Sequence, residues 1–121
     1  WPDQTPCPDG SLAACRLAEL IASNGSLSEL AAEVGEYPIR RANIETDAKT
    51  ELMSRLSNAV TDLYTNANTI DGVRVTLEEG WFLIRASGTQ PLVRIAAEAR
   101  DPATADEVFE TATSFVEDHQ P

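Results

Sequence analysis

Three short strand-like segments follow one another between residues 73 and 99, and a helical segment stands on either side of them. Apolar and polar residues alternate over residues 73–78, which is typical of a strand with one solvated face. Glu79-Gly80 forms a tight turn into a second strand over residues 81–85, and a third strand is expected over residues 92–99. Strands joined by such short connections run antiparallel. We therefore expect an antiparallel sheet in this part of the chain.

The flanking segments complete an α+β pattern. A strand is predicted over residues 39–46, and Asp47 is expected to cap a helix over residues 48–64. Asp101-Pro102 places a capping residue and then proline at the start of a final helix. The order β-α-β-β-β-α predicts an α+β domain, an antiparallel four-stranded sheet with two helices on one face.

The first third of the chain is expected to be helical. Residues 11–23 form a helix that ends at Asn24-Gly25, and a capping-box pattern over residues 26–29 opens a short second helix. The first helix is apolar nearly all round, which is typical of a helix buried in a larger body. It could pack on the rest of this chain or on a second copy. Residues 35–38 look like a linker, so we expect one unit over 1–36 and another over 37–121.

The charge balance excludes some classes of partner. The chain has 20 acidic and 9 basic residues, a formal net charge of −11, which disfavours nucleic acid and anionic membranes. Only one base is a lysine, and a lysine-poor acidic surface suggests adaptation to high salt as a hypothesis.

Other classes of site are also disfavoured by the sequence. No apolar run reaches the ~20 residues of a membrane span. Cys7, Cys15 and His119 lack zinc spacing, so no metal site is expected. Because the chain starts at Trp1 rather than Met, we interpret it as an excised piece.

The connection between the last two strands is the best candidate for a binding site. No acidic residue occurs from Gly80 to Ala97, and Arg85 and Arg94 lie within this stretch. Gly88 would let the backbone turn so that successive N–H groups point into one concavity. The Ser87 and Thr89 hydroxyls add donors, and the two arginines can make bidentate, charge-assisted bonds to an oxyanion.

Strand register determines whether the two arginines share a face. If Arg85 pairs with Leu92 across the loop, Leu83 pairs with Arg94, and both arginine side chains point to the same side. The alternative is an ordinary polar loop whose arginines are partnered by acidic residues, Glu98 or Glu78. A second basic pair, Arg40-Arg41, is interpreted as a surface feature rather than part of a cleft.

Residues 85–94, Arg-Ala-Ser-Gly-Thr-Gln-Pro-Leu-Val-Arg, resemble the phosphate-binding loop of the α-D-phosphohexomutases, the phosphoglucomutase/phosphomannomutase superfamily. Residues 71–74 and 80–81 are similar to the strand pair that leads into that loop. Residues 1–3, 9–12 and the following helix resemble the end of the family's third domain, and Tyr37-Pro38 the crossing into the fourth. Gln90 stands where many members have Glu. This departure is expected to change the anchoring of the loop or the substrate preference more than phosphate binding.

The resemblance implies a C-terminal fragment of an isomerase that transfers a phosphoryl group between C1 and C6 of a hexose phosphate. Residues 1–36 would be the end of domain three, which would cover the first helix, and residues 37–121 would be domain four. Domain four is expected to have the fold shared with TATA-box-binding protein. It would hold the phosphate that is not being transferred, through Arg85, Ala86, Ser87, Gly88, Thr89 and Arg94.

The catalytic phosphoserine, the Mg²⁺ loop and the sugar loop of intact members are absent from this chain. The fragment is therefore expected to be inactive alone, with no catalytic or metal-binding residue of its own. Mg²⁺ and a hexose bisphosphate would belong to the full-length enzyme, whose domains 1–3 would be the partners of this one, in the cytoplasm. Two other classes stay open: a stand-alone anion-binding or regulatory module, and a structural domain that dimerises through its first helix.

Overall fold

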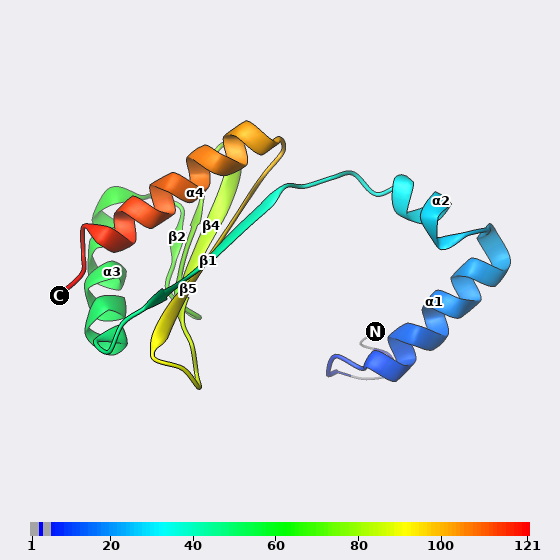
Figure 1. Cartoon of the computed structure of the whole chain (residues 1–121), viewed down its shortest axis with the longest axis horizontal. Helices are drawn as coiled ribbons and strands as arrows, with labels where there is room; N and C mark the ends of the chain where they lie inside the picture. Colours follow the sequence, from blue (N-terminus) through cyan, green and yellow to red (C-terminus); the bar gives the residue numbers. More distant parts are fainter. Residues whose placement is uncertain (1–2, 4–5) are drawn as a thin grey trace. The chain divides into compact units, whose positions relative to one another are not determined.

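The structure is a computed structural model that describes residue 3 and residues 6–121. The helices and strands within this range are distributed over two compact units, one that ends at Gly35 and one that spans Glu36–Pro121. Figure 1 shows them in sequence colours. In chain order they are α1 (Gly10–Asn24), α2 (Leu27–Ala32), β1 (Ile39–Glu45), α3 (Lys49–Leu63), β2 (Ala67–Asn68), β3 (Val73–Thr76), β4 (Gly80–Ala86), β5 (Leu92–Ala99) and α4 (Pro102–Glu117).

All five strands pair antiparallel in one sheet, in the order β1-β5-β4-β3-β2. The predicted α+β class is confirmed, with one correction to the strand number. The four predicted strands appear as β1, β3, β4 and β5, and β2 adds a fifth at the edge. Because β2 has only two residues, it is too short to show the alternation that reveals a strand in the sequence.

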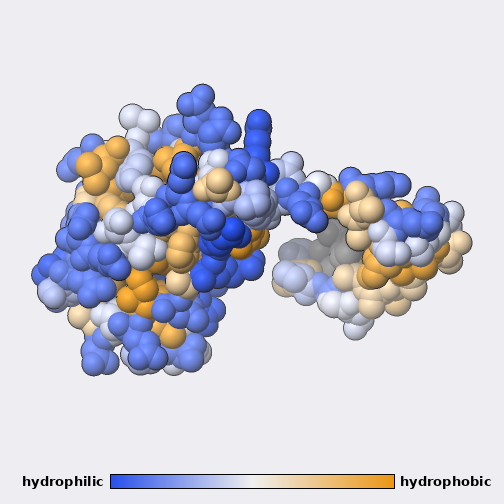
Figure 2. All heavy atoms as spheres, turned by 45° about the horizontal axis from the view of Figure 1, so that its top comes forward, coloured by the Kyte–Doolittle hydropathy of each residue, from blue (hydrophilic) through white to orange (hydrophobic). Residues whose placement is uncertain are grey.

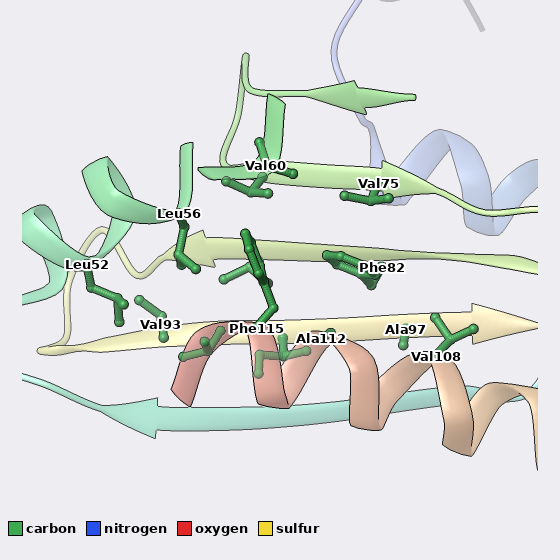
Figure 3. Packing of buried hydrophobic residues seen from close by; sticks show 14 of the residues in the cluster. Leu52, Leu56, Val60, Val75, Phe82, Val93, Ala97, Val108, Ala112 and Phe115 are labelled. Carbon is green, nitrogen blue, oxygen red and sulfur yellow. The ribbon is translucent and has the colours of Figure 1, made fainter. Parts of the chain in front are cut away.

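Helices α3 and α4 both cover the same face of the sheet, and the core lies between the two layers (Figure 3). Alternate residues of each central strand point into this layer, as the period of two requires. Phe82 is the largest fully buried side chain, and Tyr64 packs edge-on against it. The helices contribute Leu52, Leu56, Val60, Ala105, Val108, Ala112, Phe115 and Val116, and the strands contribute Val73, Val75, Phe82, Ile84, Val93, Ile95, Ala97 and Ala99.

The N-terminal unit contains α1 and α2, and the capping box expected at the start of α2 is confirmed. Asp9 caps α1 through the Leu12 N–H, and the capping box of Ser26 and Glu29 opens α2. No residue of α1 is buried, and Figure 2 shows apolar side chains gathered on this unit. The described residues of this unit therefore do not cover the apolar surface of α1.

The start of α3 corrects one expectation. Asp47 is not the cap: the helix begins at Lys49, its capping position is Ala48, and no side chain bonds to the first turn there. The Thr46 hydroxyl instead accepts a hydrogen bond from the Ala48 N–H at 3.2 Å. Because the Thr46 N–H is already bonded to the Pro91 carbonyl at 2.9 Å, the chain stays paired beside β5 before it turns into the helix.

Within the described part of the chain, no helix is both long and apolar enough to cross a membrane.

Candidate functional site

Arg85 of β4 and Arg94 of β5 lie directly opposite each other in the sheet. Leu83 pairs with Ala96, so the predicted pairs Arg85–Leu92 and Leu83–Arg94 are wrong by two residues. A shift of two residues keeps every side chain on its own face. The prediction that both arginines share a face is therefore confirmed, and their pairing is closer than expected.

The arginine pair lies on the sheet face opposite the helices, where the surface forms a hollow of about 280 Å³. Strand β1 lines it together with β4 and β5, because Asn43 pairs with Arg94 and Arg41 pairs with Ala96. Three arginines line the hollow together with Asn43 and four apolar residues. Its lining residues are Arg41, Ala42, Asn43, Leu83, Arg85, Arg94, Ile95 and Ala96.

The positive charge of this hollow is only weakly neutralised by acidic side chains nearby. Arg85 contacts Asp71 at 3.3 Å, but the two side chains are 48 % and 83 % exposed, and such a pair contributes only about 0–1 kcal/mol. Arg94 contacts the Gln90 side-chain oxygen at 3.4 Å. Like charges that face each other across a strand pair destabilise the pairing. An anion between Arg85 and Arg94 would relieve that repulsion.

The loop at Ser87–Pro91 presents backbone donors beside the arginine pair. The Ser87 N–H donates to the Leu92 carbonyl at 3.0 Å, so this amide is used within the hairpin. Within the described residues, the N–H groups of Gly88, Thr89 and Gln90 have no hydrogen-bond partner, and all three residues are exposed. Three consecutive free N–H groups can donate to the oxygens of an oxyanion.

Two details of the loop differ from the sequence interpretation. Ser87 is only 4 % exposed, and its hydroxyl has no hydrogen-bond partner among the described residues, so the loop must shift before this group can contact a ligand. Gly88 is not required for the turn, because only Gly25 and Gly72 of the described glycines have a positive φ. A Cβ at Gly88 would meet open space within 4 Å.

Two basic residues near the loop were missed by the sequence analysis. Arg41 lines the hollow rather than standing apart as a surface feature, whereas the neighbouring Arg40 bonds to Asp106 of α4. Because side chains alternate between the two faces of a strand, the sequence of β1 could have placed Arg40 and Arg41 on opposite faces of the sheet. Lys49 donates to the Ser87 carbonyl at 2.7 Å and to the Gln90 carbonyl at 3.1 Å. No local pattern in the sequence predicts the contact between Lys49 and the loop.

Over the same described residues, no group of three or more His, Cys, Asp or Glu side chains is arranged to hold a metal ion. The loop and the hollow can bind an anion through arginine side chains and backbone N–H donors.

Comparison with known proteins identifies relatives that match nearly the whole chain. It is 40 % identical over 118 residues to a "Probable phosphoglucosamine mutase" of Methanocella arvoryzae, which covers 96 % of this chain and 27 % of that protein. A protein of the same name from Methanopyrus kandleri is 42 % identical over 118 residues, with 95 % and 26 % covered. The chain thus spans about a quarter of the length of these relatives.

The fold recurs in a solved structure, a phosphoglucomutase/phosphomannomutase family protein from Burkholderia thailandensis. The TM-score is 0.76 at 24 % identity, with 93 % of this chain and 24 % of that chain covered. Residues 29–113 match the family model described as "Phosphoglucomutase/phosphomannomutase, C-terminal domain". The chain therefore belongs to the phosphoglucomutase/phosphomannomutase family, and most of it corresponds to the C-terminal domain of that family.

Proposed function

We propose that this chain is the C-terminal part of a phosphohexomutase and that its hairpin loop holds the non-transferred phosphate of a hexose phosphate. The observation that carries the proposal is the facing arginine pair, Arg85 and Arg94, beside three free loop N–H groups. In a chain with a net charge of −11, this is where a phosphate would be attracted. The proposed contact residues are Arg85, Ala86, Ser87, Gly88, Thr89 and Arg94, and the buried Ser87 hydroxyl would contact the phosphate only after the loop shifts.

The chemistry of these residues is binding, not bond breaking. Guanidinium groups make bidentate bonds to phosphate oxygens, and the loop N–H groups donate to the same anion. In phosphoryl transfer most of the rate comes from positioning and charge stabilisation at the transferred group. A domain that holds the other phosphate would fix the hexose relative to that group, and it would be inert alone.

The rest of the active site is assigned to the parent protein. We propose that residues 1–36 form the end of its third domain and that residues 37–121 form its fourth. The reacting serine and the sites for Mg²⁺ and a hexose bisphosphate would then belong to the other domains. The parent protein would act in the cytoplasm. The names of the relatives make glucosamine phosphate the first substrate to test.

A titration followed by NMR tests the proposed phosphate site. Inorganic phosphate and glucosamine 6-phosphate should shift the amide signals of residues 88–90, whereas glucosamine should not. Binding by the fragment should be weak, since each charge-assisted bond contributes about 1.5–3 kcal/mol before the cost of ordering the ligand. Arg85→Gln and Arg94→Gln should each weaken it.

Arg100→Gln is the matched control, because Arg100 is exposed and lies outside the hollow. If Arg100→Gln weakens binding as much as Arg94→Gln, the signal reports net charge only and the proposed site is wrong. A mutase assay on the fragment should give no turnover. Measurable turnover would contradict the assignment of the reacting groups to other domains.

A further inference from the structure

Lys49, the only lysine of the chain, is tied to the backbone of the candidate loop. Its Nζ donates to the Ser87 carbonyl at 2.7 Å and to the Gln90 carbonyl at 3.1 Å. Lys49 is the first residue of α3, a helix on the face opposite the arginine pair. One ammonium group from the helix layer thus joins two points of a five-residue loop.

This contact fixes the direction of an amide group. In a trans peptide the carbonyl and the next N–H point to opposite sides. Because the Ser87 carbonyl points toward Lys49, the Gly88 N–H points away from it. The Gln90 carbonyl accepts from Lys49 and also from the Leu92 N–H at 2.9 Å, and it is followed by Pro91, which has no N–H to orient. Lys49 therefore holds carbonyls on its own side of the loop and leaves the Gly88 donor on the other side.

The same contact removes an electrostatic obstacle. A carbonyl oxygen aimed at an anion would repel it, and a peptide group that was free to rotate could turn its carbonyl toward the anion. Two charge-assisted bonds to the ammonium group reduce that freedom. They also keep a positive charge next to the loop without exposing the lysine fully.

We propose that Lys49 is a positioning residue of the phosphate site. It holds the Ser87–Pro91 loop in a conformation whose Gly88 N–H points away from Lys49 and is offered to an anion, and it does not itself contact the ligand. This inference rests on the proposed function, because a positioning role for Lys49 requires that the loop binds a phosphate.

The test compares Lys49→Met, Lys49→Arg and a control, Arg55→Gln, in the 121-residue chain. Arg55 lies on the same helix and contacts Glu51 and the Gln120 carbonyl rather than the loop. Each variant is titrated with inorganic phosphate, and backbone order parameters of residues 88–90 are measured without phosphate. Melting temperatures show that each variant is folded.

Lys49→Met should weaken phosphate binding about tenfold and lower the order parameters of the loop amides. Lys49→Arg should restore most of both, and Arg55→Gln should change neither. Weaker binding by Lys49→Met with unchanged loop order would mean that Lys49 acts only through its charge, and the proposal would be wrong. Unchanged binding would overturn it as well.

The wild-type titration separates this inference from the proposed function. If the wild-type chain binds phosphate at residues 88–90 and Lys49→Met binds it equally well, only the inference about Lys49 fails. If the wild-type chain does not bind phosphate, the proposed function fails and the inference about Lys49 fails with it.

A different observation assigns a second residue to the site. The Arg41 side chain lines the hollow from β1, and it makes no ion pair or hydrogen bond with the rest of the described chain. Three arginines that line one hollow repel one another, and a bound anion would offset that repulsion. We infer that Arg41 is a third phosphate-binding arginine, again on the basis of the proposed function.

Arg41→Gln should weaken inorganic phosphate binding by about three- to tenfold at low salt, and Arg100→Gln should weaken it far less. Both variants remove one positive charge from an exposed position. An equal loss in the two variants would show that Arg41 acts only through net charge, and no loss in Arg41→Gln would exclude it from the site. Either result would leave the wild-type binding at residues 88–90 intact.

Discussion

Two glycines near the arginine pair meet different requirements. Gly72 has φ +88°, and a Cβ there would lie 2.4 Å from the Ile84 carbonyl oxygen and 2.7 Å from the Arg85 Cβ. The backbone itself therefore requires glycine at this position, directly against the strand that carries Arg85. Gly88 has neither a positive φ nor a close neighbour. The fold does not explain glycine there, whereas a ligand that approaches the loop would.

Gly72→Ala should destabilise the chain strongly. A side chain in the left-handed region costs on the order of 1–3 kcal/mol, and the clash with the β4 backbone adds to it. Urea denaturation measures the free energy of unfolding, with Gly88→Ala as the comparison. A loss below about 0.5 kcal/mol would contradict the strain described for this turn.

Gly88→Ala should separate stability from binding. Because alanine fits the backbone and meets open space, the free energy of unfolding should stay the same or rise by about 0.4–1 kcal/mol through reduced freedom of the unfolded chain. The added methyl group would stand beside the free loop N–H groups, so phosphate affinity should fall. The phosphate titration and a urea melt measure the two effects. Unchanged affinity would argue against ligand contact at this position.

At the scale of elements, the ends of the helices follow local chemistry in most cases. Asp101 accepts hydrogen bonds from the Ala103 and Thr104 N–H groups at 3.0 Å, as the Asp-Pro pattern predicts. The start of α3 does not follow its pattern. The chain stays paired with Pro91 as far as Thr46, and the next residue, Asp47, makes no capping bond, because the helix begins one residue later with Ala48 at the capping position.

The Asp101 cap should make the stability of α4 depend on pH. Its hydrogen bond from the Thr104 hydroxyl, followed by those from the Thr104 and Ala103 N–H groups, lowers the pKa of the Asp101 carboxyl. A carboxyl whose pKa is lowered by folding contributes stability above its ordinary pKa and loses it as the pH falls through the lowered value. Asp101→Asn, which caps without a charge, should therefore be less stable than wild type at neutral pH, and the difference should shrink in strong acid.

Thermal melts from neutral to strongly acidic pH measure this difference. Asp47→Asn is the matched control, because Asp47 also stands at a helix start but makes no capping bond. A difference between wild type and Asp101→Asn that is the same at every pH would contradict the cap as the origin of the pH dependence.

At the scale of the whole molecule, the charge is unevenly distributed. The chain carries a net charge of −11, yet three arginines meet at one hollow of the sheet and leave the remainder even more acidic. Crowded negative charge destabilises a compact state through self-repulsion, whereas the local positive charge of the hollow attracts an anion.

Added salt should stabilise the chain. The screening length falls from about 30 Å at 0.01 M to about 3 Å at 1 M, so repulsion among the acidic residues weakens. The melting temperature should rise from low to molar sodium chloride, while phosphate binding to the arginines should weaken over the same range. Sorbitol at equal osmolality controls for general solute effects. A flat melting temperature would contradict the high-salt hypothesis.

The sequence by itself was enough to predict most of the elements and the candidate loop. Periods of two and of three to four, caps such as Ser26 and Asp101, and the acid-free stretch around Arg85 are all local features, so they can be read without a fold. They led to the α+β class and to the arginine loop.

Only the tertiary structure decided what gathers around that loop. Lys49 reaches the Ser87 carbonyl across 38 positions in sequence, and Arg41 joins the hollow because β1 happens to pair with β5. Strand order and register come from the burial of one sheet face against α3 and α4, which depends on all the strands at once. No short pattern encodes that choice, and so the two added basic residues became visible only when the chain was folded.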